Sequence, residues 1–495
     1  MQMPDLKLMN APCVMAFDLR LADGSILAIN EIVRVVPSKR LVCKALWNNQ
    51  AVYAKVFIGT NAKRYAQRDK NGVQSLINAN IATPDLLYAG SIDDNINAGE
   101  VLIFKSITAQ NAEVLYQQLI DSKQQPARLH LMLQLTNIVA QMHNANLQQT
   151  DLYFKNFLVD ADAVYAIDGD GIQPFSTLLK KRQKQHNLAV LLSKMDGLDT
   201  DWTDDCYAHY CKQTDRKYSA LDYAEHYVLT QKIRQKAASH YADKKVFRTC
   251  TDVKVKQSFK QYIAISHDFD VTNLSSLELD NALSDAKNRF KSGNTCTVGR
   301  ALMANRNVVI KRYNIKNIWH AFKLSITQSR AAKSWANAHR LQLLNVATAK
   351  PLALIEERFG CFRQRAYFLT EYIDVPDIAE FFALSIDAAA KQKVAYETAL
   401  LFYKLNLLQI SHGDCKASNI KIVDGRPVLI DLDSMQAHTS IGWFERKHIR
   451  DLKRFMQNWA NTPETAAIFK LAFMQAYNEI DDYMMPTILE RAKIA

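Results

Sequence analysis

The sequence predicts an α+β protein built from two tandem domains, each with a small β-rich lobe followed by a larger helical lobe. Three observations lead to this prediction. The chain has 495 residues, more than one ordinary hydrophobic core holds. A strand-turn-strand pattern that ends near a lysine occurs twice, at residues 40–57 and 294–313. An Asp-x4-Asn-x11-Asp spacing follows each copy and helical patterns come after it, which is the order of an α+β domain.

The strand patterns of the two halves correspond position by position. Val42 precedes Lys55 by 13 residues, and Val298 precedes Lys311 by 13 residues. Each lysine is flanked by apolar, β-branched residues, so we expect it on a strand. A repeat of this kind makes two domains of similar fold the simplest interpretation.

The helical patterns of the two halves also correspond, at residues 186–192 and 450–456. Between the copies lies a basic, helical-looking stretch at 232–245 that has no apolar stripe of its own. We therefore expect the domains at residues 1–240 and 241–495.

Composition limits the partners and the compartment. A net charge of +12 favours an acidic partner, such as an anionic glycolipid, a membrane surface or a nucleotide. Nucleic acid is disfavoured, because no aromatic-basic platform or groove-reading helix is evident. The eight cysteines show neither Cys-x-x-Cys spacing nor a neighbouring His cluster, which argues against a zinc site or a disulfide framework. No 18-residue apolar stretch and no signal-peptide core occur, so we expect a cytoplasmic protein without a transmembrane segment; attachment to the inner-membrane surface stays open.

The second copy carries four residues suited to phosphoryl transfer. This reaction needs a clamped triphosphate, cations to neutralise its charge and an acceptor hydroxyl aimed in line. Lys311 would contact the α- and β-phosphates, and Asp414 would orient the acceptor hydroxyl. Asn419 and Asp431 supply hard oxygen ligands for Mg²⁺. The segment between them contains "VDGR", a turn signal that predicts a hairpin returning both residues to one end.

The first copy repeats these residues at the same spacings. Lys55 takes the place of the strand lysine, and Asp151 takes that of the acceptor-orienting aspartate. Asn156 and Asp168 are the corresponding metal ligands. The N-terminal copy is therefore a second candidate for catalysis.

These motifs resemble the protein-kinase signature set, and most closely the bacterial lipopolysaccharide core kinases of the Kdo/WaaP family. The segments that carry the resemblance are "VVIKRYN", "ISHGDCKASN" and "VLIDLDSM" in the second half. The first half resembles a sister copy through "AVYAKVFIG", "TDLYFKNFLV" and "YAIDGDGI". The resemblance implies an ATP- and Mg²⁺-dependent kinase that phosphorylates a sugar hydroxyl of the lipopolysaccharide inner core at the cytoplasmic membrane surface.

The resemblance also implies roles for further residues. His412 would support the catalytic loop, and Lys416 would neutralise the γ-phosphate. The nucleotide would be contacted through the loop, strand and hinge positions Gly293, Val298, Glu371 and Val42, together with Lys311 and Lys55.

Each copy departs from the family pattern. The N-terminal copy has Gln149 where His412 stands, and its phosphate loop has no glycine, so Lys39 and Arg40 would compensate with charge. Kinase-like folds pair the strand lysine with a helix glutamate, but the aligned positions are Asp69 and Ser334. Either another acid pairs with Lys311, or ligand alone holds it. We therefore expect the C-terminal copy to be the main catalytic domain, with the other copy either active or a pseudokinase.

Two alternatives to a sugar kinase remain. The acceptor could be a protein hydroxyl, although no long activation segment is evident after Asp431. One or both copies could instead be a non-catalytic nucleotide-binding scaffold in envelope biogenesis. A basic amphipathic helix at 314–333, containing Trp319, is a candidate for contact with an anionic surface.

Overall fold

A computed structural model describes residues 5–9, 12–93, 98–161, 163–176, 180–271, 274–293, 295–314, 328–360, 362–478 and 485–494. The chain divides into two compact units. Unit 1 comprises Met1–Met195 and Trp202–Arg234, and unit 2 comprises Asp196–Asp201 and Gln235–Ala495. The stretch at 232–245, expected to be helical, lies almost entirely within helix α6 (Ala220–Asp243), which passes from one unit to the other.

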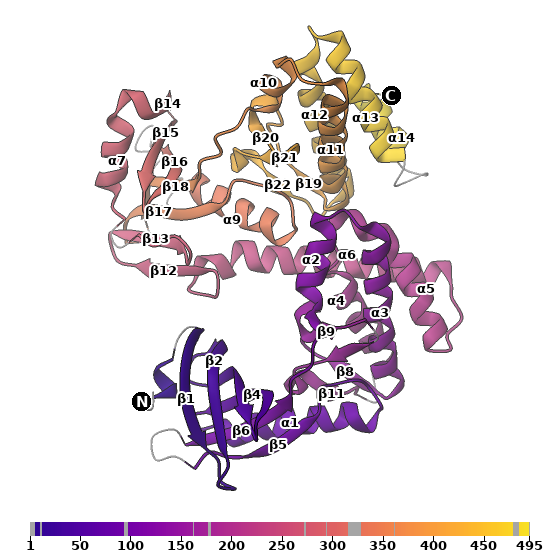
Figure 1. Cartoon of the computed structure of the whole chain (residues 1–495). Coiled ribbons are helices and arrows are strands. Elements are labelled where there is room, and N and C mark those ends of the chain that lie inside the picture. The colour runs from indigo at the N-terminus through magenta and orange to yellow at the C-terminus, as the bar shows by residue number, and fades with distance from the viewer. Residues whose placement is uncertain are drawn as a thin grey trace. The chain divides into compact units, whose positions relative to one another are not determined.

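Unit 1 begins with a six-stranded antiparallel sheet in the order β1-β2-β3-β4-β6-β5 (Figure 1). Its strands are β1 (Cys13–Arg20), β2 (Ile26–Val36), β3 (Arg40–Trp47), β4 (Gln50–Ile58), β5 (Leu86–Ser91) and β6 (Gly99–Lys105). Short strands follow: β7 (Gln110–Asn111), β8 (Leu147–Gln149), β9 (Phe157–Val159), β10 (Val164–Ala166) and β11 (Ile172–Pro174). Its helices besides α6 are α1 (Ala62–Asn78), α2 (Ala112–Asp121), α3 (Gln125–Asn144), α4 (Lys180–Leu192) and α5 (Thr203–Gln213).

Unit 2 repeats this plan with a seven-stranded sheet in the order β12-β13-β17-β18-β16-β15-β14. Its strands are β12 (Val253–Gln257), β13 (Gln261–Ser266), β14 (Arg289–Ser292), β15 (Cys296–Met303), β16 (Arg306–Tyr313), β17 (Pro351–Phe359) and β18 (Phe362–Glu371). The short strands are β19 (Ile410–Ser411), β20 (Ile420–Val423), β21 (Arg426–Leu429) and β22 (Gln436–Ala437). The helices are α7 (Ser276–Ser284), α9 (Arg330–Leu343), α10 (Ile378–Ala383), α11 (Ala388–Leu407), α12 (Ile441–Met456), α13 (Pro463–Asn478) and α14 (Met485–Ala492).

The two sheets share five strands in the same order, β2-β3-β4-β6-β5 in unit 1 and β14-β15-β16-β18-β17 in unit 2. Unit 1 adds β1 beside β2, whereas unit 2 adds β12 and β13 beside β17, at the opposite edge. The predicted strand-turn-strand patterns are the hairpins β3–β4 and β15–β16. Both hairpins turn through two residues with positive φ, Asn48-Asn49 and Ala304-Asn305, the backbone that a tight two-residue turn requires. The predicted α+β architecture of two repeated segments is confirmed.

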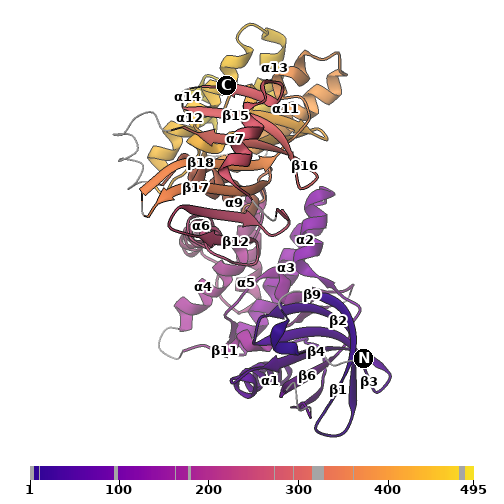
Figure 2. The same ribbon diagram turned by 90° about the vertical axis from the view of Figure 1, so that its left-hand side faces the viewer.

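One long helix packs against each shared sheet. Helix α1 lies along β4 and β6 in unit 1, and α9 lies along β17 and β18 in unit 2, as the view in Figure 2 also shows. Trp335 of α9 is fully buried, and its indole N–H donates to the carbonyl of Val246 at 3.1 Å. Such packing fixes the face of the helix that meets the sheet, and so the side chains it presents to the strand lysine.

A second hairpin in each unit brings the predicted metal ligands together. Strands β20 and β21 pair with Ile420 opposite Leu429, and Asp424 and Gly425 form the turn with positive φ. The hairpin predicted from "VDGR" is thus confirmed. The N–H of Ile430 donates to the carbonyl of Asn419 at 2.9 Å, so Asn419 and Asp431 lie at one end of the hairpin.

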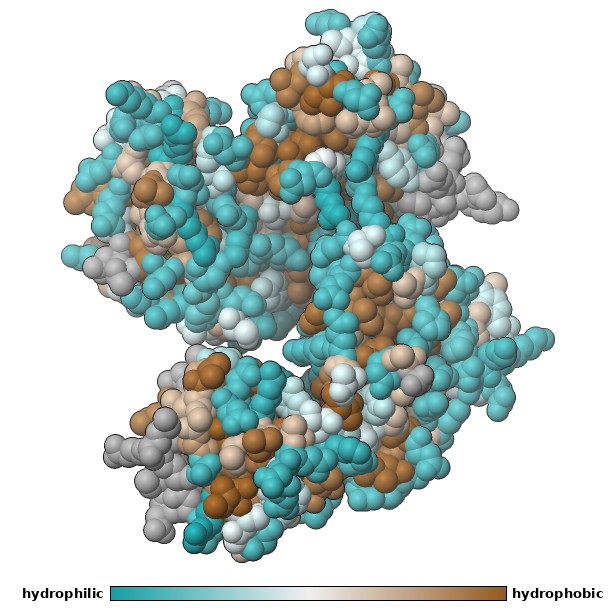
Figure 3. Space-filling view, in the orientation of Figure 1, coloured by the Kyte–Doolittle hydropathy of each residue, from teal (hydrophilic) through white to brown (hydrophobic). Residues whose placement is uncertain are grey.

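Much of the face in Figure 3 is hydrophilic, with apolar patches between the polar residues. In the described part of the chain, no helix has both the length and the apolar character needed to cross a bilayer. The amphipathic helix predicted at 314–333 falls mainly on residues 315–327, which lie outside the described residues.

Candidate active site

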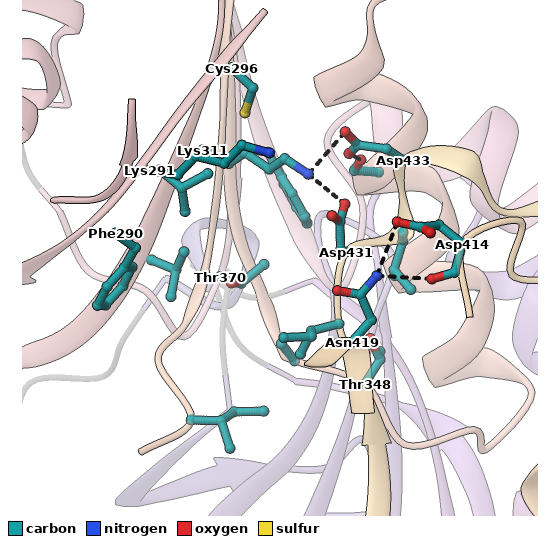
Figure 4. A pocket seen from close by; sticks show the side chains of 18 of the residues that line it. Phe290, Lys291, Cys296, Lys311, Thr348, Thr370, Asp414, Asn419, Asp431 and Asp433 are labelled. Carbon is teal, nitrogen blue, oxygen red and sulfur yellow. Dashed lines mark hydrogen bonds and ion pairs between the residues drawn. The ribbon is translucent and has the colours of Figure 1, made fainter. Parts of the chain in front are cut away.

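Unit 2 contains a cavity of about 510 Å³. The four residues predicted to serve phosphoryl transfer in the second copy all line it: Lys311 from β16, Asp414 and Asn419 from the loop after β19, and Asp431 after β21 (Figure 4). Residues more than 100 positions apart in the sequence therefore meet in one cavity, which also has room for a nucleotide-sized ligand.

Two aspartates hold the strand lysine. Lys311 Nζ lies 2.5 Å from Asp431 Oδ1 and 2.9 Å from Asp433 Oδ2 (Figure 4). The side chain of Asp433 is 6% exposed, whereas that of Asp431 is 39% exposed. Ser334 stands where kinase-like folds have the helix acid that pairs with the strand lysine, and Asp433 makes that pair in its place. Asp431 stays accessible from the cavity.

Asp433 is held by three further side chains. Ser334 Oγ donates to Asp433 Oδ1 at 2.6 Å, and the hydroxyl of Tyr313 donates to the same oxygen. Arg330 Nη2 lies 2.8 Å from Asp433 Oδ2. Burial raises the pKa of Asp433, but the charge of Lys311 and the donated hydrogen bonds outweigh burial and place that pKa below its ordinary value. Burial would lower the pKa of Lys311, yet the two carboxylates raise it. The pair is therefore charged at neutral pH.

Asp431 and Asn419 present oxygen atoms suited to Mg²⁺. Asp431 has φ +59°, a left-handed conformation that non-glycine residues adopt rarely and that often marks functional sites. The amide nitrogen of Asn419 donates to the backbone carbonyl of Asp414 at 2.9 Å, so its oxygen is left for another partner. In the described residues no three His, Cys, Asp or Glu side chains form a closed metal cage. One carboxylate and one amide oxygen nevertheless suit Mg²⁺, which completes its shell with water and phosphate oxygens.

Two basic side chains lie beside Asp414. Asp414 Oδ2 lies 3.8 Å from Lys416 Nζ, and Asp414 Oδ1 lies 3.8 Å from Arg454 Nε. Lys416 also lines the cavity. A negatively charged group that approached Asp414 would therefore meet two cations.

His412 supports the loop from behind the cavity. It is buried, and its Nε2 lies 3.0 Å from the carbonyl of Ile430, the residue before Asp431. Asp451 of α12 accepts hydrogen bonds from the backbone N–H groups of His412 at 2.7 Å and Gly413 at 3.0 Å. Burial raises the pKa of Asp451, and the two N–H donors offset part of that effect. His412 therefore positions the loop and does not face the cavity.

Two further residues predicted to contact the nucleotide, Val298 and Glu371, also line the cavity. The rings of Phe290 and Tyr372, which line it as well, stack with their centroids 5.8 Å apart and offer aromatic surface to a planar base. Gly293 lies in the turn after β14 and is not among the described residues that line the cavity.

Unit 1 has a smaller cavity at the corresponding place, about 230 Å³. Val42, Lys55 and Asp168 line it, but Asp151 and Asn156 are not among the described lining residues. In the strand register, Tyr53 and Phe104 face each other where unit 2 has Val309 and Thr370. The larger side chains reduce the space for a ligand.

Two cations hold Asp168, the predicted metal ligand of unit 1. Asp168 Oδ1 lies 3.3 Å from Lys55 Nζ and 3.2 Å from Arg40 Nη1. Burial raises the pKa of Asp168, but the charges of Lys55 and Arg40 outweigh burial and lower it below the ordinary value. Arg40 thus neutralises the predicted metal ligand of unit 1 with its own positive charge.

Unit 1 keeps its lysine anchor on the helix. Lys55 Nζ lies 2.6 Å from Asp69 Oδ2, and Asp69 is fully buried. Burial raises the pKa of Asp69, and Lys55 offsets this only in part. Aspartate is one methylene shorter than glutamate, but Gly72 of α1 and Gly169 bring helix and loop backbones into direct contact. In unit 2 the aligned residues are larger, Asn337 and Leu432, and the Asn337 amide donates to the Leu432 carbonyl at 3.0 Å.

We expect Gly72→Ala to destabilise unit 1 by about 1–3 kcal/mol, because the added Cβ atom would collide with the carbonyl of Gly169. In an ordinary helix this substitution stabilises by about 1 kcal/mol. Thermal unfolding of the whole chain measures the sign directly. Gly171→Ala is the matched control, since its added atom would lie 3.5 Å from its nearest neighbour. A gain in stability for Gly72→Ala would contradict the close approach.

Unit 1 lacks the loop-supporting histidine, as its sequence indicates, but it keeps the hydrogen bond that the histidine makes in unit 2. Gln149 stands in the place of His412, and its Nε2 donates to the carbonyl of Ile167 at 2.9 Å. Ile167 directly precedes Asp168, as Ile430 precedes Asp431. An amide therefore makes the same bond as the imidazole.

Sequence reasoning missed the roles of Asp433, Tyr313 and Arg330. One signal was available, since both copies contain Asp-x-Asp, with Asp170 in unit 1 at the position of Asp433. In unit 1 this second aspartate pairs with Arg68, on the outer side of α1. The spacing alone does not show which of the two aspartates meets the strand lysine.

Comparison with known proteins agrees with this geometry. The profile of the "Lipopolysaccharide kinase (Kdo/WaaP) family" matches residues 61–213 and 281–477, well over half of the chain. No curated protein matches. A solved structure titled "Structure of vaccinia related kinase 3" is similar, with a TM-score of 0.25 and 12% identity over 34% of this chain. The match covers 55% of that kinase, so this chain spans about half of its length. The chain belongs to the lipopolysaccharide kinase (Kdo/WaaP) family, as a tandem of kinase-like domains.

Proposed function

We propose that the protein is an ATP- and Mg²⁺-dependent kinase that phosphorylates a sugar hydroxyl of the lipopolysaccharide inner core. Unit 2 is the catalytic domain in this proposal, working at the cytoplasmic face of the inner membrane. The observation that carries it is that Lys311, Asp414, Asn419 and Asp431 all line one cavity. The sugar acceptor follows from membership of the family and not from the cavity itself.

Asp414 is the residue we assign to the acceptor. Its carboxylate would accept a hydrogen bond from the sugar hydroxyl and orient the attacking oxygen. Lys416 lines the same part of the cavity and would offset negative charge on the transferred phosphoryl group. Arg454, 3.8 Å from Asp414, adds a cation where an anionic acceptor would enter.

Lys311 is the residue we assign to the α- and β-phosphates. Asn419 and Asp431 would hold Mg²⁺, which neutralises phosphate charge when bound. Asp431 then has to turn its oxygen atoms away from Lys311, which lies 2.5 Å away in the structure. Asp433 remains as the anchor of the lysine in that state, and its burial keeps its position fixed.

A second candidate function applies to unit 1 alone. Arg40 on Asp168 and the smaller cavity favour a non-catalytic unit that accepts a nucleoside-sized group without a metal ion. In that case unit 1 would be a scaffold or a regulatory partner of unit 2.

Transfer of labelled phosphate from ATP to dephosphorylated inner-core glycolipid tests the main proposal. We expect labelled glycolipid with Mg²⁺ and none with a chelator present. An added denatured protein and the kinase chain itself serve as competing protein acceptors. Mass spectrometry then shows which of the acceptors carries the phosphate. Label found only on protein hydroxyls would contradict the sugar acceptor, and no label on any acceptor would favour the nucleotide-binding scaffold.

A further inference from the structure

Helix α12 (Ile441–Met456) carries a stripe of exposed basic residues that begins at an exposed tryptophan. Trp443 is 63% exposed, and Arg446, Arg450 and Arg454 follow it at intervals of three or four residues. This spacing places all four side chains on one face of the helix. We call these four residues, with Lys447 beside them, the α12 basic stripe.

Among the described residues, the carboxylates that meet the stripe are fewer than its four cations: Asp414 lies 3.8 Å from Arg454, and the buried Asp451 interacts electrostatically with Arg450. The other acid of helix α12, Glu445, is engaged by α14. Glu445 Oε2 lies 2.9 Å from Arg491 of α14, and Asp451 is buried beneath the catalytic loop, where it accepts backbone hydrogen bonds. The stripe therefore presents a concentrated positive charge, in a chain whose net charge is +12.

The stripe leads to the catalytic loop. Arg450 Nη2 donates to the carbonyl of Gly413 at 3.2 Å, and Arg454 Nε lies 3.8 Å from Asp414 Oδ1. Trp443 lies at the other end, in the first turn of the helix, with the guanidinium of Arg446 5.7 Å from its ring. An anionic surface bound along the stripe would thus lie next to Asp414.

We propose that the α12 basic stripe docks unit 2 on the surface of an anionic membrane. Lysine and arginine side chains are attracted to anionic headgroups, and tryptophan prefers the level of the headgroups in a bilayer. An exposed tryptophan at one end of a basic helix face meets both requirements. This inference rests on the proposed function, because a glycolipid acceptor anchored in such a membrane would be presented to Asp414.

Sedimentation of the whole chain with vesicles, without ATP, tests the proposal. Wild-type protein should bind vesicles of phosphatidylcholine with phosphatidylglycerol and not vesicles of phosphatidylcholine alone, and salt should weaken binding. The double variant Trp443→Ser/Arg446→Ser should lower the partition coefficient about tenfold. Lys470→Ser/Leu471→Ser on α13 is the matched control, since it also removes an exposed cation and an exposed apolar residue.

Three outcomes would overturn the proposal: equal binding to both vesicle types, no effect of the α12 variant, or an equal effect of the control. Preference for a soluble anionic oligosaccharide over vesicles would also overturn it. ATP binding of the α12 variant, measured by fluorescence titration, should stay within about twofold of wild type, because neither Trp443 nor Arg446 lines the nucleotide cavity among the described residues. Vesicle binding without any kinase activity would contradict the proposed function and leave the docking surface intact.

Discussion

Replacing Asp414 by Asn is expected to lower kcat of the whole chain by about 10²–10⁴-fold, the range for loss of a positioned acid–base group. The amide keeps the shape of the side chain but loses the charge that orients the acceptor hydroxyl. Asp414 lines the unit 2 cavity, and the affinity for ATP should change little, since Lys311 and Asp431 remain. Steady-state transfer of labelled phosphate to the glycolipid measures both parameters.

Asp151→Asn is the matched variant in unit 1, and we expect it to leave kcat within about twofold. Asp151 is not among the described residues that line the unit 1 cavity, and Arg40 already pairs with Asp168 there. If Asp151→Asn instead removes most of the activity, the assignment of catalysis to unit 2 is wrong. A partial loss in both variants would mean that both units catalyse transfer.

Replacing Asp433 by Asn is expected to lower kcat/KM for ATP by about tenfold to hundredfold, through misplacement of Lys311. In wild type the lysine lies 2.9 Å from this carboxylate, which Ser334 also contacts at 2.6 Å. Without the charge, Lys311 keeps only Asp431, which must also serve Mg²⁺. Asp424→Asn, in the exposed hairpin turn, is the control and should behave as wild type.

A second substitution should distinguish positioning from a general loss of packing. Ser334→Glu in the Asp433→Asn background returns the acid to the helix, where kinase-like folds usually place it. Glutamate and not aspartate is needed, because Asn337 and Leu432 replace the glycine pair that lets α1 approach in unit 1. Recovery of kcat/KM by Ser334→Glu but not by Ser334→Asp would support a positioning role, and no recovery by Ser334→Glu would contradict it.

The pH dependence of stability provides an independent readout for Asp433. Its pKa is lowered in the folded state, so its contribution is fully present above the ordinary carboxyl value of 3.8 and is lost as the pH falls through the folded pKa. The pKa of Lys311 is raised above its ordinary value of 10.5, so the ion pair with Asp433 persists beyond that pH on the alkaline side. The stability difference between wild type and Asp433→Asn should therefore be constant from about pH 5 to 9 and shrink below about pH 4, as denaturant titrations at several pH values would show.

Much of the site follows from residue spacing. Lys311, Asp414, Asn419 and Asp431 were predicted as one site, and all four line one cavity. Hairpins explain in part why these residues lie together, because a two-residue turn determines which residues return to the same end. Inference from the sequence is least informative where a different residue type makes an equivalent contact. Gln149 makes the hydrogen bond that His412 makes, and a pattern search that requires histidine reads it as a loss.

The α+β class, the tandem repeat and the residues that meet at the end of each hairpin can be inferred from the sequence alone, because these features depend on local turns and strand alternation. The acid that holds each strand lysine can be identified only from the packing of the fold. Two glycines bring α1 close enough for Asp69 in unit 1, whereas Asn337 and Leu432 occupy that contact in unit 2 and Asp433 holds Lys311. Helix-to-loop packing sets this choice, and no local pattern records the distance between two segments about 100 residues apart.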